Sequence, residues 1–133
     1  MALPQNRSIP DAAVMPVLGY ANVREAADWL CRAFGFTPRL RIGEHRVQLV
    51  YGSGALVVTE GTVGEGASVM VRVADADAHC EQARAAGALI AREPETQVYG
   101  ERQYTAADPE GRLWTFTQSV ADVDPQSWGG ELV

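Results

Sequence analysis

The stretch NVREAADWLCRAFG, residues 22–35, gives the first indication of the fold. Asn22 is a favourable helix N-cap, and Glu25 follows three residues later, the spacing of a capping box. Apolar side chains recur at helical spacing through the stretch, and Gly35 follows the last of them. We therefore predict a helix between Asn22 and Gly35.

A second stretch, DADAHCEQARAAG at residues 75–87, has the same organisation. Asp75 is the expected N-cap, the interior is rich in alanine, and Gly87 is the expected end. The two glycines that end the helices are roughly fifty residues apart, which is the length of a supersecondary repeat. The sequence thus indicates two similar halves.

Each predicted helix is preceded by one short apolar strand and followed by three strand-like runs. The expected strands are residues 14–20, 36–42, 46–51 and 55–60 in the first half, and 68–73, 88–92, 102–107 and 113–118 in the second. Tight turns, Gly52-Ser53-Gly54 and Asp108-Pro109-Glu110-Gly111, separate the last two strands of each half.

The fold class that follows is α+β, built from paired βαβββ modules. We expect one domain over residues 1–133, with module one at about 13–62, module two at about 67–119 and a C-terminal tail at 120–133. A generic α+β sandwich without internal symmetry is the alternative on pattern alone.

Composition excludes several classes of partner. The net charge is −6 with only eleven Lys and Arg, and the absence of a basic patch argues against nucleic acid. No apolar run reaches the ~20 residues of a membrane span, and residues 1–10 do not resemble a secretory signal, so we expect a soluble cytoplasmic protein without membrane contact. Cys31 and Cys80 have no neighbouring ligand pattern and are expected to be reduced thiols.

Three groups of residues carry a family resemblance. They are NVREA at 22–26 with WLCRAFGF at 29–36, VADAD at 73–77 with AAGA at 85–88, and YGER at 99–102 leading into DPEGRLW at 108–114. Together they resemble the glyoxalase/bleomycin-resistance/extradiol-dioxygenase superfamily, also called the vicinal oxygen chelate (VOC) superfamily, over about residues 14–118.

The resemblance implies that the paired modules form a curled mixed sheet around a cleft, often in a dimer. We expect a homodimer here too, because such small paired units leave sheet edges and an apolar rim that a second copy could cover. In the family's metalloenzymes, four strand residues, usually His, Glu or Gln, hold a divalent metal there. Counting along the motifs places those four positions at Met15, Val58, Ser68 and Thr115. None of the four is a good ligand, so we expect no metal and no cofactor, and a member of the superfamily that lacks the metal site.

The two histidines do not supply the missing ligands. His45 is expected in a turn and His79 on the polar side of the second helix, both as solvated surface residues. Four aromatic residues, Trp29, Phe34, Trp114 and Phe116, are expected to belong to the core beneath the helices.

Strand alternation predicts which side chains face the cleft. The predicted cleft face comprises Met15, Val17, Leu56, Val58, Glu60, Ser68, Met70, Arg72, Arg102, Tyr104, Thr115 and Thr117. The ligand-binding residues that we predict from it are Met15, Val58, Glu60, Ser68, Met70, Arg72, Arg102, Tyr104 and Thr115; catalytic residues are unknown. Arg72 needs an anion or a complete set of hydrogen bonds, and Glu60 is one possible structural partner.

Three functions remain open. The first is a protein that binds a small apolar or aromatic molecule in its cleft without a catalytic metal. The second is a glyoxalase-, lyase- or epimerase-type enzyme that uses Glu60, with or without a recruited divalent metal. The third is a dimeric interaction module with a degenerate cleft. A free Glu60 would favour a cationic ligand and a free Arg72 an anionic one, while the tail around Trp128 either docks across a dimer partner or is loose.

Overall fold

The computed structural model describes residues 5–62, 67–107, 109 and 111–133. In the first half, β1 (Val14–Tyr20) leads through α1 (Val23–Phe34) into three further strands, β2 (Thr37–Ile42), β3 (Arg46–Tyr51) and β4 (Gly54–Glu60). The second half repeats this order with β5 (Ser68–Arg72), α2 (Ala76–Ala85), β6 (Leu89–Thr96), β7 (Glu101–Ala107) and β8 (Leu113–Ser119). The predicted α+β class of paired βαβββ units is therefore confirmed.

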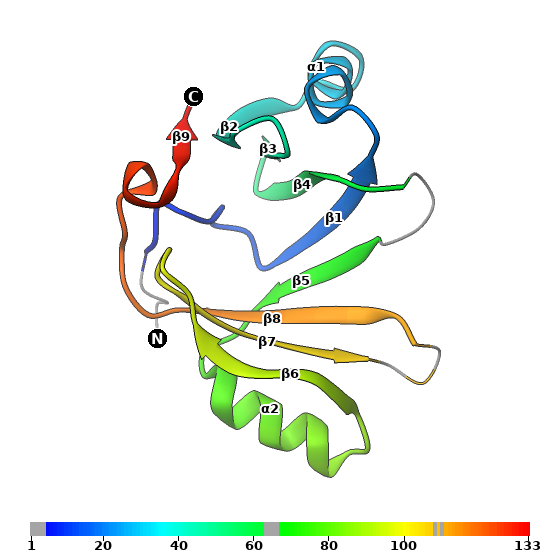
Figure 1. The fold of residues 1–133 in the computed structure, drawn as a ribbon, viewed down its shortest axis with the longest axis vertical. Coiled ribbons are helices and arrows are strands. Elements are labelled where there is room, and N and C mark those ends of the chain that lie inside the picture. Colours follow the sequence, from blue (N-terminus) through cyan, green and yellow to red (C-terminus); the bar gives the residue numbers. More distant parts are fainter. Residues whose placement is uncertain (1–4, 63–66, 108, 110) are drawn as a thin grey trace.

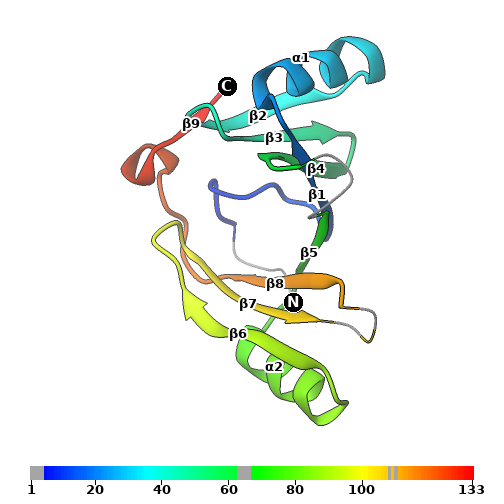
Figure 2. The ribbon, with the colours of Figure 1, turned by 45° about the vertical axis from the view of Figure 1, so that its right-hand side comes forward.

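All strands belong to one curled sheet in the order β6-β7-β8-β5-β1-β4-β3-β2-β9. The two halves meet where β1 pairs antiparallel with β5, while β1 pairs parallel with β4 and β5 parallel with β8. Figures 1 and 2 show that the sheet curls so that α1 and α2 lie on its outer face, at opposite ends of the molecule. The inner face is left for the chain ends and a cleft.

The helix ends follow the predicted capping. The Asn22 side chain accepts a hydrogen bond from the backbone N–H of Glu25 at 3.0 Å, and Gly35 ends α1 with a φ of 82°. Asp75 accepts from the N–H of Ala78 at 3.0 Å at the start of α2. These local signals hold because capping depends on neighbouring residues alone.

The apolar core forms three clusters. Under α1, Val23, Ala27 and Leu30 pack on β3 and β4 residues that include Val58. Under α2, Ala76 and Cys80 pack on β7 residues that include Tyr104. On the inner face, the third cluster contains Ile9, Ala12, Met15, Val17, Ala55, Val57 and Met70.

Two aromatic side chains of α1 are not in the core, contrary to prediction. Trp29 is 49% exposed and Phe34 58% exposed, and they contact each other edge to face at 4.7 Å. The inward stripe of α1 is occupied by Val23, Ala27 and Leu30 instead. Phe116 does pack beneath α2, as predicted.

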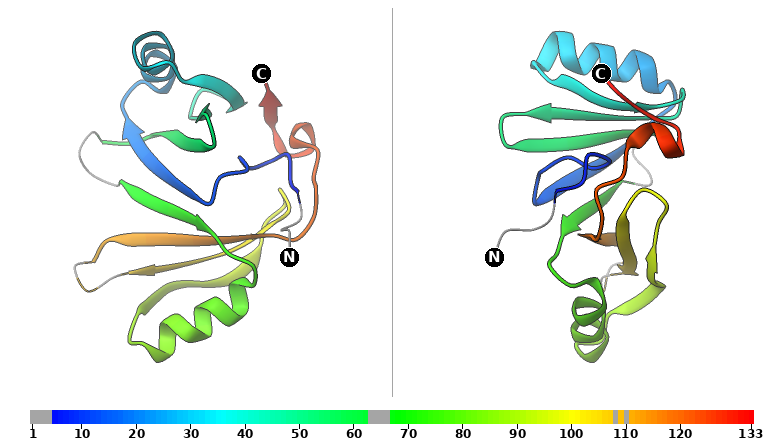
Figure 3. Two further views of the ribbon diagram at one scale, coloured as in Figure 1. Left: turned by 180° about the vertical axis from the view of Figure 1, so that it is seen from behind. Right: turned by 90° about the vertical axis from the view of Figure 1, so that its left-hand side faces the viewer.

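The C-terminal tail docks on its own chain, so the expectation of a loose tail was wrong. After β8 it forms the 3₁₀ turn η1 (Pro125–Trp128) and then β9 (Gly130–Leu132), which pairs antiparallel with β2 at the sheet edge. Figure 3 shows the N-terminal segment, residues 5–13, and the tail side by side across the open side of the curl.

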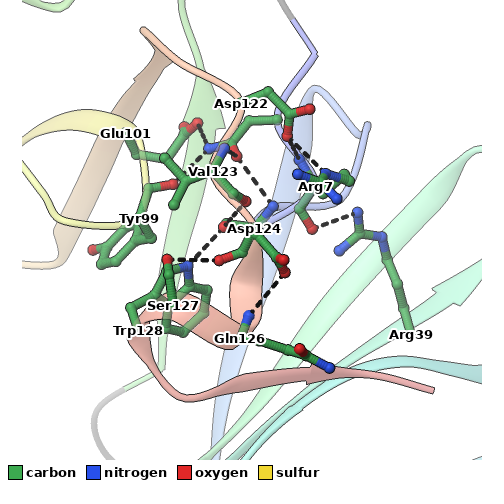
Figure 4. Close-up of polar contacts among 12 residues, drawn as sticks. Arg7, Arg39, Tyr99, Glu101, Asp122, Val123, Asp124, Gln126, Ser127 and Trp128 are labelled. Carbon is green, nitrogen blue, oxygen red and sulfur yellow. Dashed lines mark hydrogen bonds and ion pairs between the residues drawn. The ribbon is translucent and has the colours of Figure 1, made fainter.

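Side-chain hydrogen bonds fix this tail to the N-terminal segment. Asp122 accepts from the Arg7 side chain at 3.1 Å, and the indole N–H of Trp128 donates to the Ser8 hydroxyl at 2.8 Å. Figure 4 shows Arg7 beside Asp122 and Val123, and Trp128 beside Tyr99.

Three further expectations concern a turn, the cysteines and the membrane. The turn residues Asp108 and Glu110 lie outside the described residues. Both cysteines are free thiols, Cys80 buried and Cys31 half-buried, and burial raises the pKa of each. Within the described ranges, no helix is long and apolar enough to cross a membrane.

Candidate ligand-binding cleft

The concave face of the sheet encloses a cavity of about 500 Å³. It is lined by residues of the eight strands β1 to β8, by the N-terminal segment and by Trp128 of the tail. Both halves of the chain thus contribute to one cleft, and the chain ends lie across it. A volume of this size falls in the range of small-molecule sites.

The floor of the cleft contains four of the predicted binding residues. Met15, Ser68, Met70 and Thr115 all line the cavity. Met15 is fully buried and pairs with Met70 across the junction of the two halves, and Met70 pairs in turn with Thr115. The prediction placed these side chains on the correct face of β1, β5 and β8, and a binding role for them stays a prediction.

Val58 does not face the cleft, because the prediction was out of step by one residue. Val58 is fully buried under α1, whereas its neighbour Val57 lines the cavity. The prediction counted from the turn glycines, but Gly54 is already the first residue of β4 whereas β8 starts two residues after Gly111. A slip of one residue moves a whole strand to the opposite face.

The same one-residue error on β4 affects the prediction for Glu60. It lies at the end of β4, its side chain is exposed, and it is not among the residues that line the cavity. Its backbone N–H donates to the carbonyl of His45 at 3.0 Å. The prediction of Glu60 as a cleft residue is therefore wrong.

Arg102 and Tyr104 also lie on the outer face. Arg102 donates two hydrogen bonds to Asp77 of α2, at 2.7 and 2.9 Å. Tyr104 is buried beneath α2, its hydroxyl contacts the His79 ring, and burial raises the pKa of Tyr104 to about 12. His79 is thus half-buried against Tyr104 and Phe116 rather than a solvated surface residue.

Arg72 lies on the inner side of β5, and its guanidinium donates hydrogen bonds to acceptors of the protein. Its guanidinium donates to the hydroxyl of Ser119 at 3.0 Å and to the carbonyl of Pro10 at 3.2 Å. It is not among the cavity-lining residues. Of the two possibilities for Arg72, the structure favours a set of hydrogen bonds within the protein.

Glu101 is the cleft residue that the sequence analysis missed. Its side chain is completely buried yet lines the cavity, and it accepts hydrogen bonds from Asn6 at 2.8 Å and from Thr117 and Ser119 at 2.6 Å each. The prediction began β7 one residue late, at Arg102, and chose the wrong parity. The available signal was the Gly-Glu pair of the YGER motif, since a carboxylate after a turn glycine can point inward.

The opposite wall, on β3, has Arg46 and Gln48 facing the cavity. The buried Gln48 side chain accepts from Arg39 at 2.7 Å and donates to the carbonyl of Ser8 at 2.9 Å. Arg46 is half-buried, and burial lowers the pKa of its guanidinium. In the described part of the chain, no hydrogen bond or ion pair of the Arg46 side chain to a protein group is found.

An aromatic pair lies near Arg46 at the cavity wall. The rings of Tyr99 and Trp128 are 5.4 Å apart, and both residues line the cavity. The Tyr99 hydroxyl donates to Gln103 at 2.8 Å, and burial raises the pKa of Tyr99, an effect that the nearby Arg46 reduces.

Residues 13–116 match the model of the family described as the glyoxalase/bleomycin resistance protein/dioxygenase superfamily. The match covers most of the chain, including both halves of the cleft. The chain belongs to this superfamily.

Solved structures share the superfamily fold. The Mn(II)-bound glyoxalase from Novosphingobium aromaticivorans aligns with a TM-score of 0.67 and 16% identity over 93% of this chain and 43% of that one. A glyoxalase/bleomycin resistance protein/dioxygenase superfamily member from Vibrio splendidus 12B01 aligns with a TM-score of 0.59 and 18% identity over 80% and 97% of the two chains. At these identities the likeness concerns the fold alone.

TioX from Micromonospora sp. ML1 is 35% identical over 79% of this chain and 96% of that chain, with a TM-score of 0.38. A search of curated proteins finds no match.

The donor set at the metal positions of the superfamily does not fit a divalent ion. Met15, Ser68 and Thr115 offer a thioether and two hydroxyls to the cleft, and the aliphatic Val57 takes the fourth place. Both oxygens of Glu101 already accept hydrogen bonds. Across the described residues, no group of three His, Cys, Asp or Glu side chains could hold a metal.

Proposed function

We propose that this superfamily member binds a small, largely apolar or aromatic molecule in the cleft between its two halves, without a catalytic metal. The observation that supports the proposal is the cavity of about 500 Å³, whose floor is formed by Met15, Val17, Val57 and Met70. Apolar side chains on the floor, with polar and charged groups around them that can orient a ligand, are typical of small-molecule sites.

The cavity also separates this proposal from the interaction-module hypothesis. A degenerate cleft would be filled by its own side chains, whereas the N-terminal segment and Trp128 border this cavity without filling it. The enzyme hypothesis depended on Glu60, which lies outside the cavity. Among the described lining residues Glu101 is the sole carboxylate, and three hydrogen-bond donors already engage its two oxygens.

A titration with a neutral fluorescent probe, N-phenyl-1-naphthylamine, tests the proposal. We expect saturable binding of one molecule per chain. Ser68→Phe, which places a ring on the cavity floor, should remove most of this binding, because it occupies the space that the probe needs. Thr37→Phe, at an exposed position on β2 outside the cavity, is the matched control and should bind as wild type does.

Two results would contradict the proposal. One is the absence of saturable binding by the wild-type protein. The other is equal binding by Ser68→Phe and Thr37→Phe, which would place the probe elsewhere on the surface.

A further inference from the structure

Arg46 is the half-buried cationic side chain of the cleft wall for which no counter-charge is found among the described residues. It begins β3 and lines the cavity. Two other half-buried arginines differ from it: Arg39 donates to Gln48 and to the carbonyl of Arg7, and Arg72 donates to Ser119 and to the carbonyl of Pro10. For Arg46, no such acceptor is found in the described part of the chain.

The carboxylate of the cleft does not neutralise Arg46 either. The oxygens of Glu101 are directed to Asn6, Thr117 and Ser119. The charge interaction found for Arg46 is with the phenol of Tyr99, a neutral group at pH 7. Partial burial of a guanidinium without an anion costs free energy that a bound anion would offset.

The surroundings of Arg46 add positive charge. The exposed Arg92 lines the cavity from β6, which brings a second guanidinium to this cleft. Both Arg46 and Arg92 lower the pKa of Tyr99, so both lie close to its phenol. This part of the cleft is therefore cationic, although the whole chain carries a net charge of −6.

An apolar partner surface lies next to this charge. Trp128 is held by its hydrogen bond to Ser8 and contacts the ring of Tyr99, and both aromatic residues line the cavity. A planar molecule with one acidic group could contact these rings while its acidic group lies against a guanidinium.

We propose that Arg46 binds the anionic group of the cleft's ligand, and that the ligand class is a planar aromatic molecule carrying a carboxylate, sulfonate or phosphate. The inference rests on the proposed function, because it assigns the chemistry of the same cavity. It replaces Glu60 and Arg72, the two residues from which the sequence left the ligand charge open, with a third residue.

Two probes with the same rings separate the two proposals. N-Phenyl-1-naphthylamine is neutral, and 8-anilino-1-naphthalenesulfonate carries a sulfonate on the same scaffold. Wild-type protein should bind the sulfonate tighter than the neutral probe by roughly tenfold, the magnitude of one charge-assisted hydrogen-bonded contact. In Arg46→Met this preference should disappear while the affinity for the neutral probe is kept.

Arg41→Met is the matched control. It removes the same charge from the neighbouring strand β2, at a surface depression shared with Arg24 and Asp28 outside the cleft. It should keep the wild-type preference for the sulfonate. Arg46→Lys, which keeps the charge but not the planar fork, should keep part of the preference.

Each outcome decides between the proposals. If the wild-type protein binds both probes equally, or if Arg46→Met and Arg41→Met keep the same preference, Arg46 is not the anion anchor and the pocket stands. If neither probe binds saturably, the proposed function fails and the inference fails with it. Unchanged affinity of Arg46→Met for the neutral probe reports that its cavity is intact, so a folding defect is distinguished from a lost contact.

Discussion

The two sides of the cleft differ in whether their buried or half-buried charged side chains have hydrogen-bond partners in the protein. On the β7 side, Glu101 accepts from three donors, and Gln103 joins Tyr99 to Thr117 through two further hydrogen bonds. On the β3 side, Gln48 is satisfied by Arg39 and Ser8, but Arg46 faces the cavity with no protein acceptor found among the described residues. The carboxylate of the β7 side is thus engaged within the protein, whereas the half-buried cation of the β3 side is available for a ligand.

Strand pairing places Arg46 and Gln103 at matching positions in the two halves. Arg46 is opposite Thr59 on β4, and Gln103 is opposite Thr117 on β8. The same place in the two halves therefore carries a neutral side chain with two partners in one case and a cation in the other. Repetition of the backbone has not led to repetition of the chemistry.

Removing the carboxylate of the β7 side should have the largest effect. Glu101→Leu leaves Asn6, Thr117 and Ser119 with buried donors that have lost their acceptor, at an expected cost of about 3 kcal/mol in the free energy of unfolding. Glu101→Gln, which keeps the shape and one acceptor, should cost less. Urea denaturation at pH 7 measures both, and a change below about 0.5 kcal/mol for Glu101→Leu would show that the network does not stabilise the fold.

The link between this network and the tail should be the next most sensitive. Gly100 has a φ of 86°, and a Cβ at this position would overlap the carbonyl oxygen of Ala121 at the start of the tail. Gly100→Ala should therefore lower the free energy of unfolding by about 2 kcal/mol. Gly52→Ala is the control: Gly52 also has positive φ, at 57°, but a Cβ added there would have no atom within 4 Å among the described residues, so the difference between the variants reports the contact with the tail.

The sequence analysis predicted the helices and strands better than it predicted which side chains face the cleft. The elements were predictable, because caps such as Asn22 and Asp75 and short apolar strands are local signals. The cleft face was predicted correctly on β1, β5 and β8 and wrongly on β4 and β7. Side-chain direction has a period of two in a strand, so an error of one residue at a turn reverses every assignment on that strand.

The ends of the chain were not predictable in this way. Asn6 bonds Glu101 and Trp128 bonds Ser8, contacts between residues about a hundred positions apart that leave no local pattern in the sequence. The role proposed for Arg46 also depends on the absence of a protein acceptor for it among the described residues. That absence can be recognised only from the positions of the neighbouring side chains in the structure. Composition could not reveal it, since the net acidic charge suggested the opposite sign.

Removing the cation of the β3 side should change stability little, in contrast to Glu101. Arg46→Leu breaks no hydrogen bond or ion pair found in the described part of the chain, and it relieves the cost of a partly buried charge. We expect a free energy of unfolding within about 0.5 kcal/mol of wild type, or slightly above it. Urea denaturation beside Glu101→Leu makes the comparison; a loss as large as that of Glu101→Leu would mean that Arg46 is a structural residue.

The smallest effect is expected outside the cleft, at the pair of Arg102 and Asp77. Two hydrogen bonds join these side chains across β7 and α2, but the pair is solvated, and solvated ion pairs contribute little.

The hydrogen bond from Arg102 lowers the pKa of Asp77 below its ordinary 3.8. The contribution of the pair is therefore present above about pH 4 and is lost as the pH falls through the lowered pKa of Asp77 in the folded state. Arg102→Leu should shift the urea midpoint slightly at pH 7, and the difference from wild type should become smaller in strong acid. There Asp77 is protonated in both folded and unfolded chains, and the hydrogen bond from Arg102 to Thr96 remains as the contact that the substitution removes. If the difference grew in acid, the pair would not be its source, and if Arg102→Leu also changed the affinity for either probe, the assignment of Arg102 to the outer face would be wrong.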